Sequence, residues 1–222
     1  MLSSSSVTIF GFGSGPEVIN FQPIAKPAPL AVILISFQKI KMNLESLKVD
    51  FQKIIDRVEL PDYLIYISKK ITTGDISIQE IEKTLVEYNV HHNVAKLDFI
   101  NFIFEYIKIS FEDNILTDEE KIVINYLKRL FQILPGDFMF HSKGTVESVV
   151  CFQLSLLYSD NYITPEEAVM KIELQEIFDL SYDQMNGYSK TEAKISIRQG
   201  ADLKDLDVLF THLEYFELKK IM

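Results

Sequence analysis

The chain has 222 residues, of which 47% are hydrophobic, with 16 Phe, 10 Tyr and no Trp. This composition supplies ample material for a folded core, and the lone Cys151 excludes an intramolecular disulfide, so we expect a cytoplasmic protein in a reducing compartment. The formal net charge of −10 argues against direct binding to nucleic acids or to a bare anionic membrane surface, because like charges repel.

Residues 1–41 differ in composition from the rest of the chain. They hold four of the seven prolines and three of the eight glycines, and their apolar residues follow no helical period. We therefore expect this extension to be disordered or loosely packed. The apolar run Leu30–Phe37 is too short to span a bilayer and lacks the flanks of a signal peptide. Because folded-looking sequence follows Met42 at once, we expect the native product to begin there, with one helical domain over residues 42–222.

Three turns further along the chain share one pattern of residues. In each, Gly or Asn is followed three residues later by Ser or Thr, and after three more by Glu. The three stretches are Gly74–Glu80, Asn114–Glu120 and Asn161–Glu167. Gly and Asn tolerate the left-handed backbone that ends a helix, while Ser or Thr with a following Glu can close a capping box that begins the next helix. Spacings of 40 and 47 residues between the Ser/Thr positions are typical of repeated helical hairpins.

The segments between these turns have helical apolar spacing. Val94–Ile109 and Val149–Tyr158 are apolar on nearly every face, which is typical of central helices covered by several neighbours. Buried strands are the alternative, but each run is longer than a usual strand. One-sided helices are predicted after Thr117 and Thr164. Their apolar positions are Val123, Leu127, Leu130 and Leu134 in the first, and Met170, Leu174, Ile177 and Phe178 in the second. We therefore predict an all-α fold of repeated antiparallel helical hairpins, packed as a compact bundle.

A further capped helix start is predicted at Leu180–Met185, which contains a Ser and a Gln at capping-box spacing. Beyond it, the pattern indicates one or two closing helices around Gly200, with Asp202 as a cap. Three apolar residues near the end of the chain are expected to complete the core: Leu209, Phe210 and Phe216. The alternative is an exposed apolar face that binds a partner or a second copy of the chain.

No catalytic group can be nominated from the sequence. The glycine-rich run Gly11–Gly15 has Pro16 in place of the last glycine of a dinucleotide loop, and no lysine follows to complete a Walker loop. The adjacent His91 and His92 would point about 100° apart on a helix, and the other two histidines are distant in sequence, which disfavours a zinc site. We therefore predict neither catalytic nor cofactor-binding residues.

The stretch Ser110–Glu120, followed by an amphipathic helix, resembles a signature of the tellurite-resistance TerB-like family, namely Asp-Gly, variable, apolar, Ser/Thr/Asp, variable, Glu-Glu. Ser159–Glu167 and the helix after it look like a second copy. The resemblance covers roughly residues 71–185. It departs from the family in that Asn stands at the usual Gly position of both copies, and the residues after Gly187 have no clear counterpart.

The resemblance implies an all-α hairpin domain without established enzymatic activity, associated with stress-response and membrane-proximal complexes, that binds a divalent cation. Carried over by position, the candidate ligands are Asp113, Glu119 and Glu120 from one copy and Asp160, Glu166 and Glu167 from the other. The alternative is helix capping alone, because a helix N-terminus attracts carboxylates through its free amides and its dipole. A shared ion requires carboxylate oxygens within about 5 Å of one another.

Two functions follow as hypotheses. The first is a non-catalytic helical interaction or scaffold domain that responds to a cation and binds an unidentified protein partner, with no nucleic acid and no membrane insertion. The alternative is a metal-assisted hydrolase that uses carboxylates from facing helices. The hydrolase would need an open pocket with at least three convergent carboxylates or imidazoles.

Overall fold

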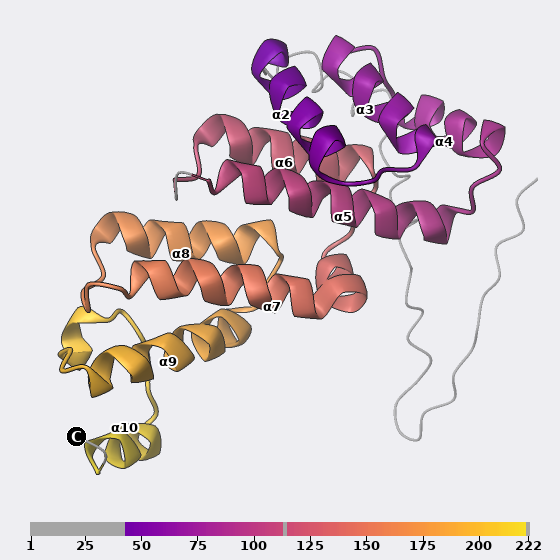
Figure 1. Cartoon of the computed structure of the whole chain (residues 1–222). Helices are drawn as coiled ribbons and strands as arrows, with labels where there is room; N and C mark the ends of the chain where they lie inside the picture. Colours follow the sequence, from indigo (N-terminus) through magenta and orange to yellow (C-terminus); the bar gives the residue numbers. More distant parts are fainter. Residues whose placement is uncertain (1–42, 113–114, 221–222) are drawn as a thin grey trace, which may run out of the picture. The chain divides into compact units, whose positions relative to one another are not determined.

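The computed structural model describes residues 43–112 and 115–220 (Figure 1). These residues belong to one of the two units into which the chain divides, the one that spans residues 41–222. The predictions for residues 1–41 and for the native start at Met42 lie outside the described residues. The described part of the chain consists of helices and turns without a strand, so the all-α prediction is confirmed.

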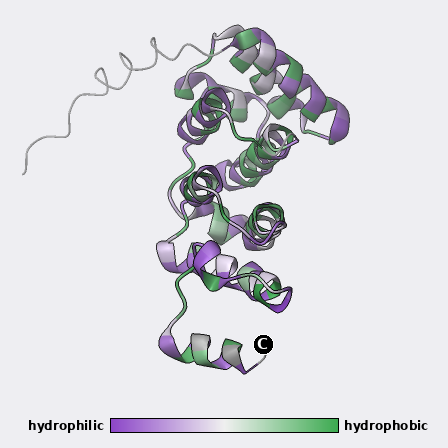
Figure 2. Cartoon of the chain, turned by 90° about the vertical axis from the view of Figure 1, so that its left-hand side faces the viewer, coloured by the Kyte–Doolittle hydropathy of each residue, from purple (hydrophilic) through white to green (hydrophobic). Residues whose placement is uncertain are grey.

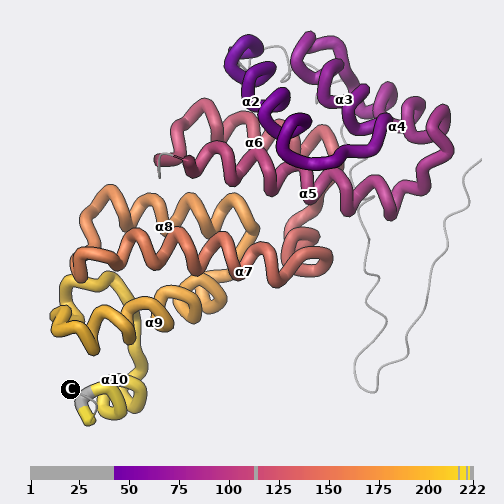
Figure 3. The backbone as a smooth tube through the Cα atoms, in the orientation of Figure 1, coloured from indigo at the N-terminus to yellow at the C-terminus, as the bar shows by residue number. Residues whose placement is uncertain are grey.

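The helices follow one another along the described chain with short connections. Their bounds are α2 (Leu44–Arg57), α3 (Asp62–Thr73), α4 (Ile78–Glu87), α5 (His92–Ser110), α6 (Asp118–Leu130), α7 (Asp137–Leu157), α8 (Pro165–Ile177), α9 (Tyr182–Arg198) and α10 (His212–Lys219), with a short 3-10 helix η1 (Leu203–Asp205) between the last two. Consecutive helices contact each other in the pairs α2–α3, α3–α4, α5–α6, α7–α8 and α8–α9 (Figure 3).

The predicted capping residues begin the helices. Ser77, Thr117 and Thr164 each accept a hydrogen bond from the third following amide, and the Glu at that position accepts one from the cap's own amide. Ser181 begins α9 in the same way with Gln184. Pairs of orphan amides are thereby satisfied at each of these helix starts. The predicted starts at these four positions are therefore confirmed.

The turns before these helices use the left-handed backbone that the pattern predicts. Gly74 has φ = 74° and Asn161 has φ = 66°, whereas Asn114 lies outside the described residues. Each signature turn joins two helices in contact, α3 to α4, α5 to α6 and α7 to α8. That these pairs are copies of one repeated unit stays a prediction.

Helix α5 lies at the centre of the first half of the fold. It contacts α2, α6 and α7, and ten of its residues are buried. The rings of Phe99 and Phe131 stack with centroids 4.2 Å apart, and Phe51 meets Phe102 edge to face at 4.9 Å. The prediction of a central helix is confirmed, although Leu97 is 42% exposed. Only the first turns of α5 therefore present an apolar side chain to solvent.

A second aromatic cluster joins α5, α7 and the end of α8. Phe104, Phe138 and Phe178 meet at centroid distances of 5.3, 5.7 and 5.7 Å. All three side chains are buried. Because they come from segments far apart in the sequence, this cluster fixes the C-terminal helices on the central one.

Three sequence predictions about exposure were wrong. Leu134 is 61% exposed, because α6 ends at Leu130 and Gln132 adopts a left-handed conformation (φ = 54°) that breaks the helical period. Helix α7 begins at Asp137, earlier than expected, and is not covered on all sides, since Phe152 is 60% exposed. The predicted core residues Leu209 and Phe216 are 66% and 57% exposed.

Polar and apolar residues are distributed along all the described helices (Figure 2). None of these helices combines the length and the continuous apolar composition that crossing a membrane requires.

Candidate functional site

The carboxylates of the two TerB-like signatures divide into capping and exposed groups. Glu120 Oε2 accepts hydrogen bonds from the Thr117 amide at 2.8 Å and the Thr117 hydroxyl at 2.7 Å. Glu167 Oε2 accepts the equivalent bonds from Thr164 at 2.8 and 2.9 Å. Two of the six candidate cation ligands are therefore already occupied in helix capping boxes.

The other candidate ligands do not converge on them. Asp160 Oδ1 accepts a hydrogen bond from the Tyr162 amide at 3.0 Å, within its own turn. Glu119 and Glu166 are exposed in the first turns of α6 and α8, and Asp113 lies outside the described residues. Within residues 43–112 and 115–220, no group of three or more His, Cys, Asp or Glu is placed to hold a metal ion. The described geometry supports the capping interpretation of these residues.

Lysine side chains connect acidic groups of α6 and α8. Lys121 Nζ lies 2.7 Å from Asp118 Oδ1 and 2.7 Å from Glu173 Oε1. These hydrogen bonds raise the pKa of Lys121, and the bond from Lys121 lowers the pKa of Asp118. Two turns further along α6, Lys128 Nζ donates to Asp179 Oδ2 at 2.8 Å and to the Ile177 carbonyl at 3.0 Å. Sequence reasoning missed both links, although Lys121 and Lys128 are seven residues apart and therefore lie on one face of α6.

A cation test separates capping from metal binding. We expect the melting temperature of the wild-type protein to stay the same when millimolar calcium or magnesium is added, because the capping carboxylates already have donors. A double variant Glu119→Gln/Glu166→Gln should respond in the same way. Thermal unfolding followed by circular dichroism measures both. A cation-dependent stabilisation that the double variant loses would contradict the capping interpretation.

The caps themselves have a measurable contribution. Thr164→Ala should lower the free energy of unfolding by about 1 kcal/mol, because the Glu167 amide at the start of α8 loses the Thr164 hydroxyl that accepts its hydrogen bond. Thr164→Ser should retain most of that stability, since the hydroxyl remains. Thr145→Ala, at an exposed position of α7 three residues after the kink at Ser142, is the matched control and should change little. Urea unfolding measures all three; equal losses at positions 164 and 145 would refute the capping role.

The described residues also form a groove that the sequence does not predict. It has a volume of about 620 Å³ and lies between α8, α9 and residues 203–209, which we call the strap. Apolar lining residues come from all three segments: Ala168 and Ile172 from α8, Met185 from α9, and Leu203, Val208 and Leu209 from the strap. Polar groups lie among them, including Lys171 and Asn186. The groove is therefore an amphipathic hollow, formed by segments that are not all adjacent in sequence.

Hydrogen bonds from the helices hold the strap in place. Lys171 Nζ donates to the Asp207 carbonyl at 2.6 Å and to its carboxylate at 2.8 Å. The Tyr158 hydroxyl donates to the Leu206 carbonyl at 3.0 Å. Burial raises the pKa of Tyr158 above its ordinary value, so this hydroxyl remains a donor even in alkaline solution. The wall of the groove is thus anchored from α8 and from the residue that follows α7.

Three apolar side chains at the groove remain largely in contact with solvent. Ile172, Tyr182 and Leu209 are 55%, 57% and 66% exposed, respectively. From its apolar side chain, Leu209 was expected to lie in the core. The alternative expectation, an exposed apolar face in the C-terminal segment, describes its position better. The helical period could not reveal this, because Leu209 lies in the irregular connection between η1 and α10.

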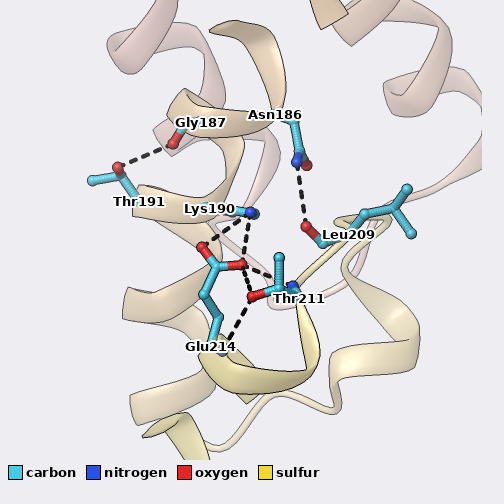
Figure 4. Close-up of polar contacts among 7 residues, drawn as sticks. All are labelled: Asn186, Gly187, Lys190, Thr191, Leu209, Thr211 and Glu214. Carbon is cyan, nitrogen blue, oxygen red and sulfur yellow. Dashed lines mark hydrogen bonds and ion pairs between the residues drawn. The ribbon is translucent and has the colours of Figure 1, made fainter. Parts of the chain in front are cut away.

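Helix α10 follows the strap and is anchored to α9 by one ion pair (Figure 4). Lys190 Nζ lies 2.8 Å from Glu214 Oε2 and 3.0 Å from Glu214 Oε1. The same Oε2 atom accepts from the Thr211 amide at 2.8 Å and the Thr211 hydroxyl at 2.9 Å. Glu214 therefore joins the capping box of α10 to its attachment on α9.

The pKa of Glu214 reports on this attachment. The bond from Lys190, followed by the bonds from the Thr211 amide and hydroxyl, lowers the Glu214 pKa from 4.5 to about 2. Since the folded-state pKa is the lower one, the stabilisation by this carboxylate is complete above pH 4.5 and is lost as the pH falls towards 2. We expect a carboxyl NMR titration of Glu214 with a midpoint near 2 in the wild type, moved upwards by Lys190→Met. A wild-type midpoint near 4.5 would show that the pair does not form in solution.

Comparisons with known proteins identify no relative of this chain. No protein-family model matches the sequence, and no curated protein or solved structure matches it either. The TerB-like resemblance therefore stays a prediction based on its turns, and the functional argument depends on the geometry of the groove.

Proposed function

We propose that the protein is a non-catalytic helical interaction domain that binds a segment of a partner protein in the groove between α8, α9 and the strap. The observation that carries the proposal is a hollow of about 620 Å³ bordered by the exposed side chains of Ile172, Tyr182 and Leu209. A small molecule inside the hollow would leave much of this apolar border in water. A peptide segment would cover the hollow and the border together, which favours a protein partner.

The charge around the groove specifies the chemistry of the partner. Residues 160–210 contain eleven acidic and five basic residues, which gives this region a net charge of −6. Of the two lysines that line the groove, Lys171 is paired with Asp207, and Lys204 lies 3.9 Å from the Asp202 carboxylate. We therefore propose an amphipathic partner segment that has an apolar face for the groove and basic residues on its flanks. The flanking charges would speed the encounter, while burial of the apolar face would supply most of the affinity.

The same proposal places the protein in a reducing compartment such as the cytoplasm. Its one cysteine, Cys151, is half-buried, and burial raises the pKa of its thiol, so that the reactive thiolate is disfavoured. The TerB-like relationship and its stress-response setting remain compatible hypotheses, since the described candidate cation ligands do not line the groove. No observation on the described residues favours the hydrolase alternative, which needs at least three convergent ligands.

The test uses two matched substitutions on α8. Ile172 lines the groove and is 55% exposed, whereas Val169 is 52% exposed and does not line it. Affinity capture from the source cells with the wild type, Ile172→Asp and Val169→Asp should give a partner that only Ile172→Asp loses. Calorimetry with a synthetic peptide from that partner should then show at least a tenfold weaker dissociation constant for Ile172→Asp. Equal binding by the two variants would refute the groove as the binding site.

A further inference from the structure

Helix α10 differs from the other α-helices of the described chain in how weakly it is attached. It has eight residues, whereas isolated helices shorter than about 12 residues are marginal in water. Among the described helices, the pairs that share the more extensive contacts do not include α10. Leu218 is buried, but Leu213 and Phe216 are 71% and 57% exposed. The formation of α10 therefore depends on a small number of docking contacts.

At the start of α10, one side chain of α9 makes an ion pair and a contact with an aromatic ring. Lys190 pairs with Glu214, and its ammonium group lies 5.9 Å from the centroid of the Phe210 ring. Glu214 Oε2 accepts from both Lys190 and Thr211, so the ion pair and the helix cap share one atom (Figure 4). Breaking the pair removes one attachment of α10 and weakens the start of the helix in the same event. Docking and folding of α10 are thus coupled.

The same face of α9 also holds the wall of the groove. Asn186, one turn before Lys190, donates from Nδ2 to the Leu209 carbonyl at 3.2 Å. Leu209 is both the last residue of the strap and part of the groove lining, and only Phe210 separates it from Thr211. When α10 leaves α9, the Lys190–Glu214 ion pair is broken. The Asn186 hydrogen bond then holds this end of the strap without that neighbouring pair. Docked α10 therefore adds a second restraint, next to the Asn186 hydrogen bond, on the end of the strap that contains Leu209.

We infer that α10 is a reversible latch, fastened by the Lys190–Glu214 pair, whose release loosens the strap and widens access to the groove. This inference deepens the proposed function, because the groove is the site that the latch would regulate. The pair is only partly shielded, with Lys190 and Glu214 side chains 17% and 33% exposed. Salt therefore weakens it, as it weakens other ion pairs near the surface.

Hydrogen–deuterium exchange of the full chain tests the latch without any partner. Lys190→Met should make the amides of α10 exchange at least about threefold faster than in the wild type, whereas those of α5 should be unchanged. Lys190→Arg keeps the charge and should keep the protection. Lys194→Met, one turn further along α9, is the matched control and should behave as the wild type. Sodium chloride at 1 M should produce in the wild type the change that Lys190→Met produces at low salt.

Two outcomes would overturn the inference. If exchange of α10 is the same in Lys190→Met and Lys194→Met, the pair does not fasten the helix. If α10 is released in Lys190→Met but partner capture is no greater than by the wild type, the latch does not regulate the groove. The exchange arm needs no partner, so failure of the latch and failure of the proposed function are distinguishable. Loss of capture by Ile172→Asp, together with α10 exchange that is the same in Lys190→Met as in the wild type, would support the groove and refute the latch.

Discussion

Phe138→Ala should destabilise the fold by about 3 to 5 kcal/mol, the largest effect that we expect from a single substitution. Phe138 is fully buried between Phe104 and Phe178, so removal of its ring leaves a cavity where α5, α7 and α8 meet. Phe140→Ala is the matched control, because Phe140 lies two residues away on α7 and is 83% exposed. Urea unfolding of both variants measures the difference. Similar losses at the two positions would show that the aromatic cluster is not formed as described.

Lys128→Met should cost about 2 kcal/mol, which is large for a lysine. The substitution keeps much of the aliphatic stem but leaves the Ile177 carbonyl and the Asp179 carboxylate without their donor at the end of α8. The side chains of Lys128 and Asp179 are mostly shielded from water, with exposures of 11% and 22%. Solvent therefore replaces the lost bonds poorly.

The control for Lys128 is a lysine in an ordinary surface pair. Lys83 Nζ lies 3.5 Å from Glu87 Oε1, and the Lys83 and Glu87 side chains are 75% and 55% exposed. Lys83→Met should change the free energy of unfolding by less than about 0.5 kcal/mol. Thermal or urea unfolding compares the two variants, and a loss at Lys128 no greater than at Lys83 would contradict the proposed link between α6 and α8.

The helix starts were the part of the fold that the sequence predicted best, for a local reason. A capping box is formed by residues three positions apart, so Ser77, Thr117, Thr164 and Ser181 could be identified without knowledge of the tertiary structure. Thr211 with Glu214 has the same spacing and begins α10. The start of α10 is therefore also encoded by residues three positions apart.

The candidate site could not be predicted in the same way, because its parts are distant in sequence. Lys171 and Asp207 are 36 residues apart, and Lys128 and Asp179 are 51 apart. A lysine in a helical pattern is equally compatible with a solvated position, and nothing in the sequence identifies its partner. Leu209 shows the opposite error, since its apolar side chain suggested the core although it lies at an exposed border of the groove.

The resemblance to TerB-like proteins drew attention to acidic residues at the helix starts. It also implied a cation-binding role for them, which the described geometry does not require. Glu120 and Glu167 accept hydrogen bonds from the caps that precede them. A family signature of this kind contains the residues that any capped helix start needs. The chemistry of the turn therefore explains the pattern before a cation is considered.

Photo-crosslinking at the groove tests the central claim most directly. A photoreactive phenylalanine analogue in place of Tyr182, which lines the groove and is 57% exposed, should capture a partner in the source cells. The same analogue in place of Tyr66, which is 44% exposed on α3 and distant from the groove lining in sequence, is the control and should not capture it. We predict a crosslinked peptide with an apolar face and basic flanks at position 182 alone. The same products at both positions, or none at position 182, would contradict the proposal that this groove binds a protein partner.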